Sequence, residues 1–527
     1  MFLSNNLLSA CVEAVTHISK LHVALVWLTY LLLLAIYRLY LSPLAAFPGP
    51  RLAALTMWYQ AYYDLCLRGQ YFRRIDQLHK QYGPVIRINP YEIHVNDPDY
   101  LSEVYGDSTK KRDKYKWIGQ STSLSQSTGG AIHHDIHRKR RAAINPFFSK
   151  AKSSQLEPII STALARLLQR VENCRQTGTI MPMNLATAAA TCDIITQYCF
   201  GQSTDFLLRE DYNKAYFDAV EMQFALSHWM IHFSWLGPLL YSAPANMLSW
   251  LMPGLGSLFK MRQRWEQQVE RIMRQGDHSI QTENNTIFHG ILTSDLPAEE
   301  KTLSRLTEEA QLLVIAGHHT TANAISAITF ELLSNPDKLF ELKRELAASL
   351  PYTGDLPRYA EVEHLPYLTA VIKEGLRLHP SVSTRIQRVS VEGPLFYHDH
   401  RQNITYTIPA GTPVSVTQLL IHMNPDVFPN PREFQPERWL GNPRLDQYLV
   451  AFSKGARMCA GINLAYQEIS LIIAALFRKY DIDGRTDGTQ PTLSLYQTLR
   501  ERDVDQVADL TVAGVATDSK GVRLQVK

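Results

Sequence analysis

The stretch F-S-K-G-A-R-M-C-A-G, from Phe452 to Gly461, decides how this chain is expected to fold. Phenylalanine, glycine, arginine, cysteine and glycine stand at its relative positions 1, 4, 6, 8 and 10, and an apolar helical run follows as far as Tyr480. This spacing is typical of a loop that holds a metal-bound sulfur, here the sulfur of Cys459. The alternative is a buried free cysteine, because unpaired cysteines are among the most buried residues in proteins.

Each residue type in this stretch suits a thiolate bound to haem iron. Gly455 permits a tight turn, and Gly461 permits a close approach of the following helix to the macrocycle. Phe452 would cover the apolar side of the sulfur. Arg457 would pair with a haem propionate, because a guanidinium binds a carboxylate in a fork. The helix that begins after Cys459 points free N–H groups and its positive dipole end at the sulfur, which favours the thiolate.

With this loop the chain resembles the cytochrome P450 family of haem-thiolate monooxygenases. The resemblance implies a mainly α fold with small β-sheets, in which an α-rich domain lies beside a smaller β domain. It also implies haem b, iron protoporphyrin IX, as the cofactor, with Cys459 as the metal ligand. No GxGxxG motif or flavin-type domain follows Tyr480. We therefore expect electrons from NADPH through a separate NADPH-cytochrome P450 reductase, with cytochrome b5 as a further candidate donor.

Basic residues at two places are expected to hold the haem propionates. In H-H-D-I-H-R-K-R-R, His137 and Arg141 are spaced i and i+4, so both side chains reach one carboxylate from one helical face. Members of the family hold a propionate with these positions. By the same resemblance Arg385 is a second propionate partner. The extended segment before it would line the substrate pocket with Val382, Ser383 and Thr384.

A long helix is predicted from Leu306 to Ser334, where an Asn-Pro pair stops it. Its middle reads A-G-H-H-T-T, and Gly317 costs about 1 kcal/mol relative to alanine, so we expect a local opening of the helix over the haem. The resemblance gives Thr320 a hydrogen bond to bound dioxygen, with Ala316 and Gly317 lining the substrate pocket. His319 stands where the family usually has Asp or Glu. Its imidazole would relay protons, or ordered water would do so instead.

A charged cluster is expected to hold the core together without taking part in the chemistry. Glu374 and Arg377 are spaced i and i+3 in V-I-K-E-G-L-R-L-H-P. Alone they describe a surface ion pair worth roughly a few tenths of a kcal/mol. The family closes a buried Glu-Arg-Arg cluster with the arginine of a later motif, here Arg438 in P-E-R-W. The resemblance therefore gives these three residues a structural role.

The amino-terminal segment is predicted to anchor the chain in a membrane. Leu21 to Tyr37 carries no formal charge over 17 residues, which spans about 25 Å, the short end of a bilayer crossing. We divide the chain into an N-terminal membrane anchor (1–40), a proline-rich hinge (41–52) and a catalytic domain (53–527). The alternative is a cleavable signal peptide, although the run lacks a basic start and a clear cleavage site. The resemblance implies the endoplasmic reticulum membrane, crossed once, with the catalytic domain facing the cytosol.

The charge balance and the cysteines exclude several classes of protein. Lysine and arginine number 53 against 50 acidic residues, a net charge of +3, so nothing indicates nucleic-acid binding. The six cysteines form no CxxC pair, which argues against a zinc site or disulfide framework and indicates a reducing compartment. A further group of basic residues has two interpretations: a solvated face, or a docking surface for an acidic redox partner. These residues are Arg138, Lys139, Arg140, Lys150, Lys152 and Lys454.

The distribution of aromatic residues and several short sequence runs indicate a more specific function. Tyr212 to Phe259 is dense in aromatic residues and methionine, typical either of helical core or of an apolar access channel and membrane-dipping face. Runs such as R-I-N-P-Y-E-I-H-V-N-D-P resemble fungal secondary-metabolism members similar to trichodiene oxygenase. The resemblance implies a monooxygenase that hydroxylates or further oxidises a small apolar, terpenoid intermediate of a mycotoxin-like pathway. The alternatives are a haem-thiolate isomerase or dehydratase that needs no reductase, and a haem-binding protein without catalysis.

Overall fold

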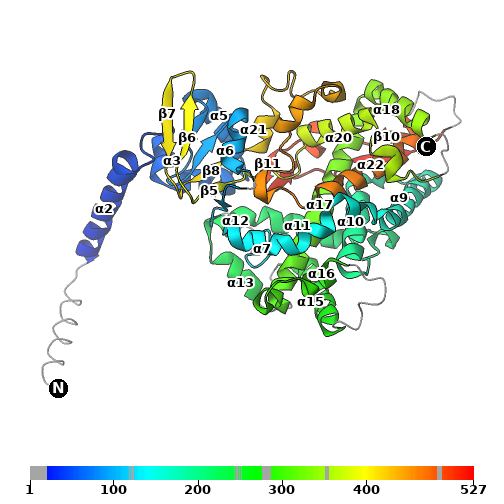
Figure 1. Ribbon diagram of the computed structural model, residues 1–527, viewed down its shortest axis with the longest axis horizontal. Coiled ribbons are helices and arrows are strands. Elements are labelled where there is room, and N and C mark those ends of the chain that lie inside the picture. The colour runs from blue at the N-terminus through cyan, green and yellow to red at the C-terminus, as the bar shows by residue number, and fades with distance from the viewer. Residues whose placement is uncertain are drawn as a thin grey trace.

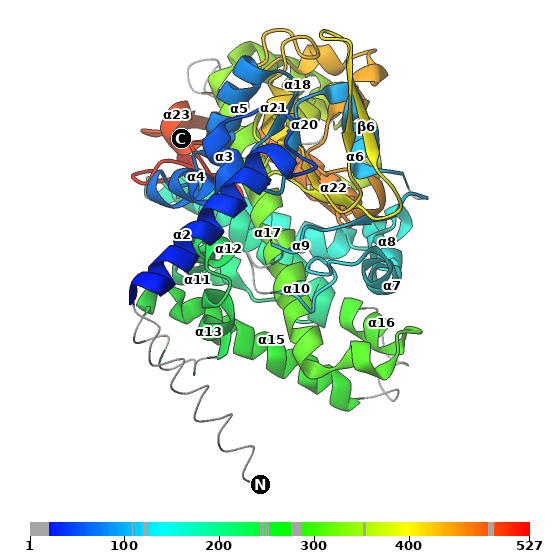
Figure 2. The same ribbon diagram turned by 90° about the vertical axis from the view of Figure 1, so that its left-hand side faces the viewer.

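The computed structural model describes residues 20–107, 109–117, 119, 124–242, 244, 247, 250, 252–275, 286–350, 355–482 and 490–527. Most of them form an α-rich body, and a smaller β-rich part lies at one corner of it (Figure 1). One long helix, α2 (Lys20–Ile36), projects from the β-rich part (Figures 1 and 2). The predicted fold class, mainly α with small β-sheets behind one apolar amino-terminal helix, is confirmed.

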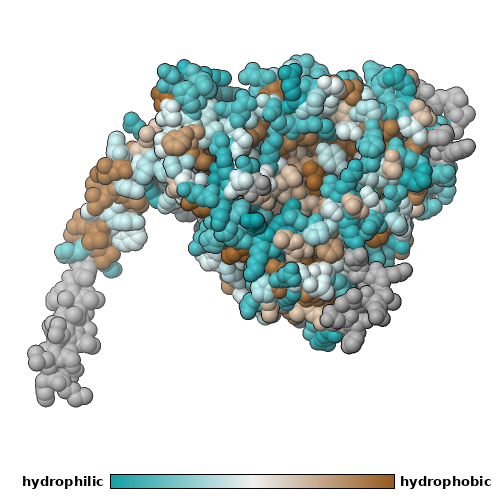
Figure 3. Space-filling model, viewed as in Figure 1, coloured by the Kyte–Doolittle hydropathy of each residue, from teal (hydrophilic) through white to brown (hydrophobic). Residues whose placement is uncertain are grey.

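Helix α2 is a candidate membrane span. With the π-helical turn η1 (Tyr37–Leu41) it forms an apolar stretch of 22 residues with mean hydropathy 1.8 and no buried part. At 1.5 Å per residue this stretch is about 33 Å long, enough to cross a bilayer. Hydrophobic residues cover much of the surface of α2, whereas the face of the body seen in the same view is largely hydrophilic (Figure 3). The part of the predicted anchor before Lys20 lies outside the described residues.

The proline-rich segment after α2 packs against the β-rich part. Leu44 and Phe47 are buried in its core, and the ring of Phe47 stacks on Tyr406 at 5.3 Å between centroids. The N–H of Arg87 donates to the carbonyl of Pro48. The segment therefore fixes the place where α2 leaves the body. It is followed by α3 (Arg51–Leu55), α4 (Trp58–Ala61) and the π-helical turn η2 (Tyr62–Cys66).

The β-rich part is built on a five-stranded sheet in the order β1-β2-β8-β5-β3. β1 (Val85–Arg87) pairs antiparallel with β2 (Ile93–Val95), which pairs in parallel with β8 (Pro413–Ser415). β5 (Arg388–Ser390) runs antiparallel to β8 and to β3 (Arg112–Asp113). Helix α5 (Tyr71–Tyr82) packs Ile75 and Leu78 on β1. Around the sheet lie α6 (Leu101–Tyr105), α21 (Gln418–His422) and a hairpin of β6 (Leu395–Asp399) and β7 (Ile404–Ile408).

The α-rich body surrounds α17 (Leu303–Ser334), which passes through the middle of the molecule (Figure 2). Thr302 caps its first turn by accepting a hydrogen bond from the N–H of Arg305. The largest hydrophobic cluster joins α17 to its neighbours. These and the outer helices are α7 (His134–Ile144), α8 (Lys150–Ser154), α9 (Glu157–Thr177), α10 (Met183–Phe200), α11 (Lys214–Ala225), α12 (Ser227–His232), α13 (Leu236–Ser242), α15 (Gly256–Gln275), α16 (Ile287–Thr293), α18 (Pro336–Ser349), α19 (Tyr359–Val362), α20 (Pro366–Leu378), α22 (Ile462–Lys479) and α23 (Arg500–Asp503).

Two small sheets complete the fold near the carboxyl end. One has the order β4-β13-β10-β9, from β4 (Met181–Pro182), β13 (Arg523–Val526), β10 (Thr492–Leu495) and β9 (Asp481–Ile482). The other is a hairpin of β11 (Ala508–Leu510) and β12 (Val512–Gly514), which turns at Thr511 with φ 74°. Short 3₁₀ segments are η3 (Pro98–Tyr100), η5 (Asn145–Phe148), η6 (Phe206–Leu208), η7 (Pro253–Leu255), η9 (Ala298–Lys301), η10 (Pro436–Trp439), η11 (Pro443–Tyr448) and η12 (Gly455–Arg457).

Candidate active site

The cysteine loop joins η12 to helix α22. Gly455 has φ +72°, and a Cβ there would lie 2.5 Å from the carbonyl oxygen of Gly106, so only glycine fits this turn. The N–H of Cys459 donates to the carbonyl of Phe452, 2.9 Å away. The ring of Phe452 packs 5.5 Å from that of Tyr466. The loop is therefore held as a fixed turn that presents the sulfur.

Opposing effects act on the pKa of the Cys459 thiol. Burial among protein atoms raises the pKa, whereas the N–H of Gly461 and the positive charge of Arg141 lower it. The last two are contacts that stabilise a thiolate. Gly461 is the N-cap of α22, and a Cβ there would meet only the ring of Phe148, at 3.9 Å. The close approach of α22 to a macrocycle at Gly461 therefore stays a prediction.

We infer that the sulfur of Cys459 lines an internal hollow. Its side chain is exposed, yet protein atoms surround it closely enough for burial to raise its pKa, and a sulfur that lines a hollow meets both conditions. On α17, Ala316 is exposed and Thr320 half-exposed, although most of their neighbours along the helix are buried. Helices α17 and α22 pack against each other. A flat group between the sulfur and this face of α17 would cover all three residues.

Four basic side chains form a cluster beside the loop: the buried His137 and Arg388, and the half-buried Lys114 and Arg457. Burial and the charges of Arg457 and Arg388 lower the pKa of Lys114 to about 7. Burial and the neighbouring cations lower the pKa of His137 to about 3. Burial lowers the pKa values of Arg388 and Arg457 to about 10. None of the four forms an ion pair with a carboxylate in the part of the chain that the structure describes, so the cluster is prepared for an anion.

The side chains of His137 and Arg141, predicted to act as a pair, have different surroundings. His137 is buried in the basic cluster. Arg141, one turn later on α7, bonds to the amide oxygen of Asn145, and its charge lowers the pKa of the Cys459 thiol. Arg457 donates from Nε, Nη1 and Nη2 to three backbone carbonyls at 3.1, 2.7 and 2.6 Å. These bonds fix its guanidinium within the cluster.

The structure corrects two predictions in the extended segment that leads into β5. Arg385 donates to Glu92 at 2.8 Å, and both side chains are buried, so its charge is already neutralised. Ser383 is also buried and donates to Asp509 at 2.8 Å, so its hydroxyl is already used within the protein. Val382 and Thr384 are half-buried and face the other way, because side chains alternate along an extended chain. Arg385 is therefore not available to a propionate, whereas Arg388 lies in the basic cluster.

The centre of α17 also differs from the prediction. The helix is regular and continuous, so the expected local opening is wrong. A Cβ at Gly317 would lie 2.7 Å from Cγ1 of Ile195 on α10, so the glycine instead permits close packing of two helices. The hydroxyl of Thr320 donates to the carbonyl of Ala316 at 3.0 Å, a bond that leaves its oxygen free to accept.

His319 points toward α11 and not along the face that carries Thr320. Its Nε2 lies 2.8 Å from Oε1 of Glu221, and its Nδ1 lies 3.4 Å from the amide nitrogen of Asn323. The neighbouring His318 is buried and lies 3.1 Å from the hydroxyl of Tyr216. A proton that passes through His319 must therefore come from the side of Glu221.

The predicted charged cluster lies in the core beneath the loop. Glu374 and Arg377 are fully buried, and Nε and Nη2 of Arg377 each donate to the carboxylate at 2.8 Å. Nε of Arg438 adds a third bond at 3.1 Å, and the indole N–H of Trp439 a fourth at 2.9 Å. An exposed ion pair is therefore excluded for these residues.

Comparison with known proteins agrees with this geometry. The family model described as Cytochrome P450 matches residues 48–501. The chain belongs to the cytochrome P450 family. It is 41% identical over 501 residues to the cytochrome P450 monooxygenase tpcC of Cochliobolus heterostrophus, covering 94% of this chain and 95% of that protein. It is 40% identical to the tryptophan 6-hydroxylase fscE of Fusarium equiseti over 500 residues, with 94% of each chain covered.

A third relative is the N-acetyltryptophan 6-hydroxylase ivoC of Emericella nidulans, 40% identical over 463 residues that cover 86% of this chain and 89% of the relative. The resemblance to fungal members is thus confirmed, and this cytochrome P450 is a monooxygenase. The family implies a haem cofactor. The residues present fit one, because the Cys459 sulfur is accessible and has thiolate-stabilising contacts, and four cations near the cysteine loop have no carboxylate partner among the described residues.

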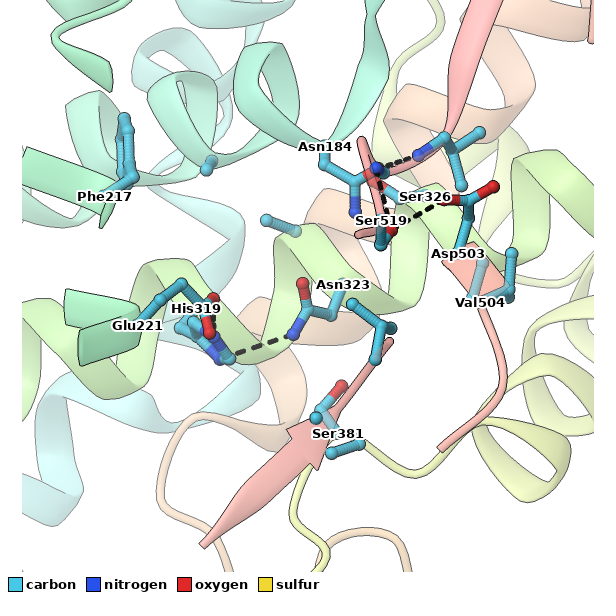
Figure 4. A pocket seen from close by; sticks show the side chains of 18 of the residues that line it. Asn184, Phe217, Glu221, His319, Asn323, Ser326, Ser381, Asp503, Val504 and Ser519 are labelled. Carbon is cyan, nitrogen blue, oxygen red and sulfur yellow. Dashed lines mark hydrogen bonds and ion pairs between the residues drawn. The ribbon is translucent and has the colours of Figure 1, made fainter. Parts of the chain in front are cut away.

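Two members of the basic cluster, Lys114 and Arg388, are not predicted from the sequence. Arg388 lies three positions after the predicted Arg385. No spacing rule shows that the side chains of Lys114 and Arg388 converge with that of Arg457. Glu221 and Asn323 were also missed. They meet His319 at the wall of a cavity of about 540 Å³ beside α17 (Figure 4). Neither Cys459 nor Thr320 belongs to the cavity wall.

Proposed function

We propose that this P450 hydroxylates or further oxidises a small intermediate of a fungal secondary-metabolite pathway while anchored once in the endoplasmic reticulum membrane, with its catalytic domain in the cytosol. The observation that carries the proposal is the accessible Cys459 just before α22, which packs on α17, with the basic cluster beside the cysteine loop. Haem bound there supplies the activation of dioxygen, with one oxygen atom going to the substrate and the other to water.

The residues of the chain position this chemistry. Cys459 would hold the iron, with Arg141 and the Gly461 N–H stabilising its negative charge. Lys114, His137, Arg388 and Arg457 would bind the propionates. Thr320 would hold a proton at its hydroxyl beside the oxygen site, with its position fixed by the bond to the Ala316 carbonyl. His319 would act only by exchanging a proton with Glu221 or with water in the cavity. Ala316, Gly317, Val382 and Thr384 would line the substrate pocket.

Electrons would come from NADPH through a separate reductase, with cytochrome b5 as a second donor. Two residues of the predicted docking surface already have ion-pair partners. Arg138 and Lys139 are exposed on α7, but Nε of Arg140 is bound to Glu300 at 2.7 Å and Nζ of Lys150 to Glu363 at 2.8 Å. Arg138 and Lys139, with the half-buried Lys152 and Lys454, are therefore the residues that would attract an acidic partner.

Exposed aromatic residues support the membrane association. Trp58 on α4 and Trp229 on α12 are 67% and 44% exposed, and both rings contact Phe233. Trp235, just before α13, is 63% exposed. Other aromatic residues of the 212–259 segment, such as Phe217, are buried. The segment thus combines helical core with an exposed aromatic surface of the kind that enters the headgroup layer.

The proposed substrate has an apolar body, and a terpenoid is the first candidate, from the resemblance to trichodiene oxygenase. A tryptophan-derived compound is the second candidate, since two relatives carry names of tryptophan hydroxylases. The purified holoprotein, combined with reductase, NADPH and isotopically labelled dioxygen, should add one labelled atom to its substrate. The metabolite that accumulates after gene deletion supplies that substrate. Product formation without reductase and dioxygen would instead support an isomerase or dehydratase.

A further inference from the structure

The cavity beside α17 has the size and lining of a small-molecule site. Its volume is about 540 Å³, within the usual range for ligand pockets. Its walls come from α10, α11, α17 and the segments around the β11–β12 hairpin, and Figure 4 shows their side chains pointing into it. The apolar part of the lining includes Leu185, Ala188, Phe217, Val220, Ala322 and Leu510.

The cavity runs close to the face of α17 that carries Thr320. Successive residues of an α-helix are turned by about 100°. Asn323 and Ala327, which line the cavity, are therefore turned about 60° and 20° from Thr320 around the helix axis. Ala316, which is exposed at the hollow, is turned about 40° in the same direction. A molecule in the cavity therefore lies against the flank of the helix face that borders the reaction site.

Glu221 offers an unused carboxylate oxygen to this cavity. Its side chain is 58% exposed, and Oε1 is bound to Nε2 of His319 at 2.8 Å. Burial by the surrounding protein raises the pKa of Glu221, but the hydrogen bond and charge of His319 outweigh it and leave the pKa below its ordinary value. The carboxylate is therefore ionised at neutral pH. Its second oxygen, Oε2, has no hydrogen-bond partner within the described residues.

The other carboxylates of the lining are already occupied. Asp218, one turn before Glu221 on α11, accepts from Nζ of Lys214 at 2.5 Å. Asp503 accepts from Arg502 and Ser519, each at 2.7 Å. The two remaining cations of the lining, Arg68 and Lys520, are exposed. Glu221 is thus the lining carboxylate that retains a free oxygen in the part of the chain that the structure describes.

We propose that Glu221 determines substrate specificity by binding a protonated amine on an otherwise apolar substrate. The amine would bond to Oε2 of Glu221, while the amide of Asn323, 3.4 Å from His319 through its nitrogen, presents its oxygen as a second acceptor. His319 fixes Oε1, so the free oxygen is held toward the cavity. The inference rests on the proposed function, because it places the amine in the cavity and the carbon to be oxidised beside Thr320.

The test compares two ligands of the same shape. Tryptamine and 3-propylindole, in which a methyl group replaces the ammonium, are titrated into the full-length holoprotein by calorimetry. A hydrogen bond to a charged group predicts that the wild type binds tryptamine at least about tenfold more tightly. Glu221→Gln should remove this preference and leave the affinity for 3-propylindole within about twofold. Asp218→Asn, a change of the paired carboxylate on the same helix, should keep the preference.

Equal affinity of the wild type for the two ligands overturns the proposal without any variant. A preference that survives in Glu221→Gln overturns it as well. If Glu221→Gln takes up no haem, Glu221→Asp replaces it, and its shorter side chain should reduce the preference to about threefold or less. The proposed function is judged separately, by reductase-dependent product formation. A chain that oxidises its own substrate yet binds both ligands equally refutes only the role of Glu221.

Discussion

Replacing Glu374 by glutamine should be among the most destabilising single changes in this chain. The carboxylate is fully buried and accepts hydrogen bonds from Arg377, Arg438, Trp439 and the backbone N–H of Gln435. The substitution removes the negative charge that neutralises two guanidinium groups. The new amide NH₂ group also faces hydrogen-bond donors and cannot accept from them. Hydrogen bonds to the side chain are therefore lost, and the two guanidinium groups stay in the core without a counter-charge.

The expected loss follows from the burial of the cluster. Breaking a buried ion pair by removing one partner costs about 3–5 kcal/mol. A matched control is Glu341→Gln on α18, because Glu341 pairs with Arg344 in the same order and spacing, but at the surface, where the arginine is 73% exposed. An exposed pair of this kind is worth about 0.3–0.5 kcal/mol.

The two variants should differ clearly in chemical unfolding. The free energy of unfolding in urea, followed by tryptophan fluorescence of the full-length protein in detergent, should fall by about 3–5 kcal/mol for Glu374→Gln and by less than about 0.5 kcal/mol for Glu341→Gln. Losses that agree within about 1 kcal/mol would show that the cluster does not carry the stability assigned to it. Glu374→Gln should also lower the yield of haem-loaded protein.

Three further results are expected. Gly317→Ala places a Cβ 2.7 Å from Ile195 and should cost about 1–3 kcal/mol of unfolding free energy, whereas Gly393→Ala, with no atom within 4 Å, should be neutral; equal effects would contradict the close packing of α10 on α17. Lys114, with its pKa near 7, should regain its proton when a propionate binds. Haem affinity should therefore fall as pH rises from about 7 toward the ordinary lysine range near 10.5, and Lys114→Met should flatten this dependence in haem titrations; an unchanged slope would remove Lys114 from the propionate site. Trp235→Ser should weaken binding of an anchor-truncated protein to phospholipid vesicles in a flotation assay, and unaltered flotation would argue against the exposed aromatic surface as a membrane contact.

Local spacing was enough to predict three local features that the structure contains. The turn at Gly455, the long central helix and the Glu374–Arg377 pair each depend on residues a few positions apart, so the sequence shows them directly. Arg438 was predicted by resemblance alone, because its 64-residue separation from Glu374 gives no local signal. The structure then supplies the contacts that join the three residues.

The errors have a common physical cause. Whether Arg385 or Arg388 faces the basic cluster depends on the phase of side-chain alternation, and Glu92, 293 residues away, fixes that phase by binding Arg385. Gly317 was expected to open its own helix, but the packing of Ile195 on α10 explains it instead. Glu221 meets His319 across 98 residues of sequence. Such contacts depend on how distant segments pack, which periodicity does not encode.

The central claim is that the sulfur of Cys459 is the protein ligand of a haem iron. The most direct test is the visible absorption of the reduced, carbon-monoxide-bound protein, compared between the wild type and Cys459→Ser. The wild type should show the long-wavelength band that thiolate ligation produces, and the variant should lose it even when it retains haem. A variant whose band is unchanged, or a wild type that remains colourless after haem supplementation, would contradict the account.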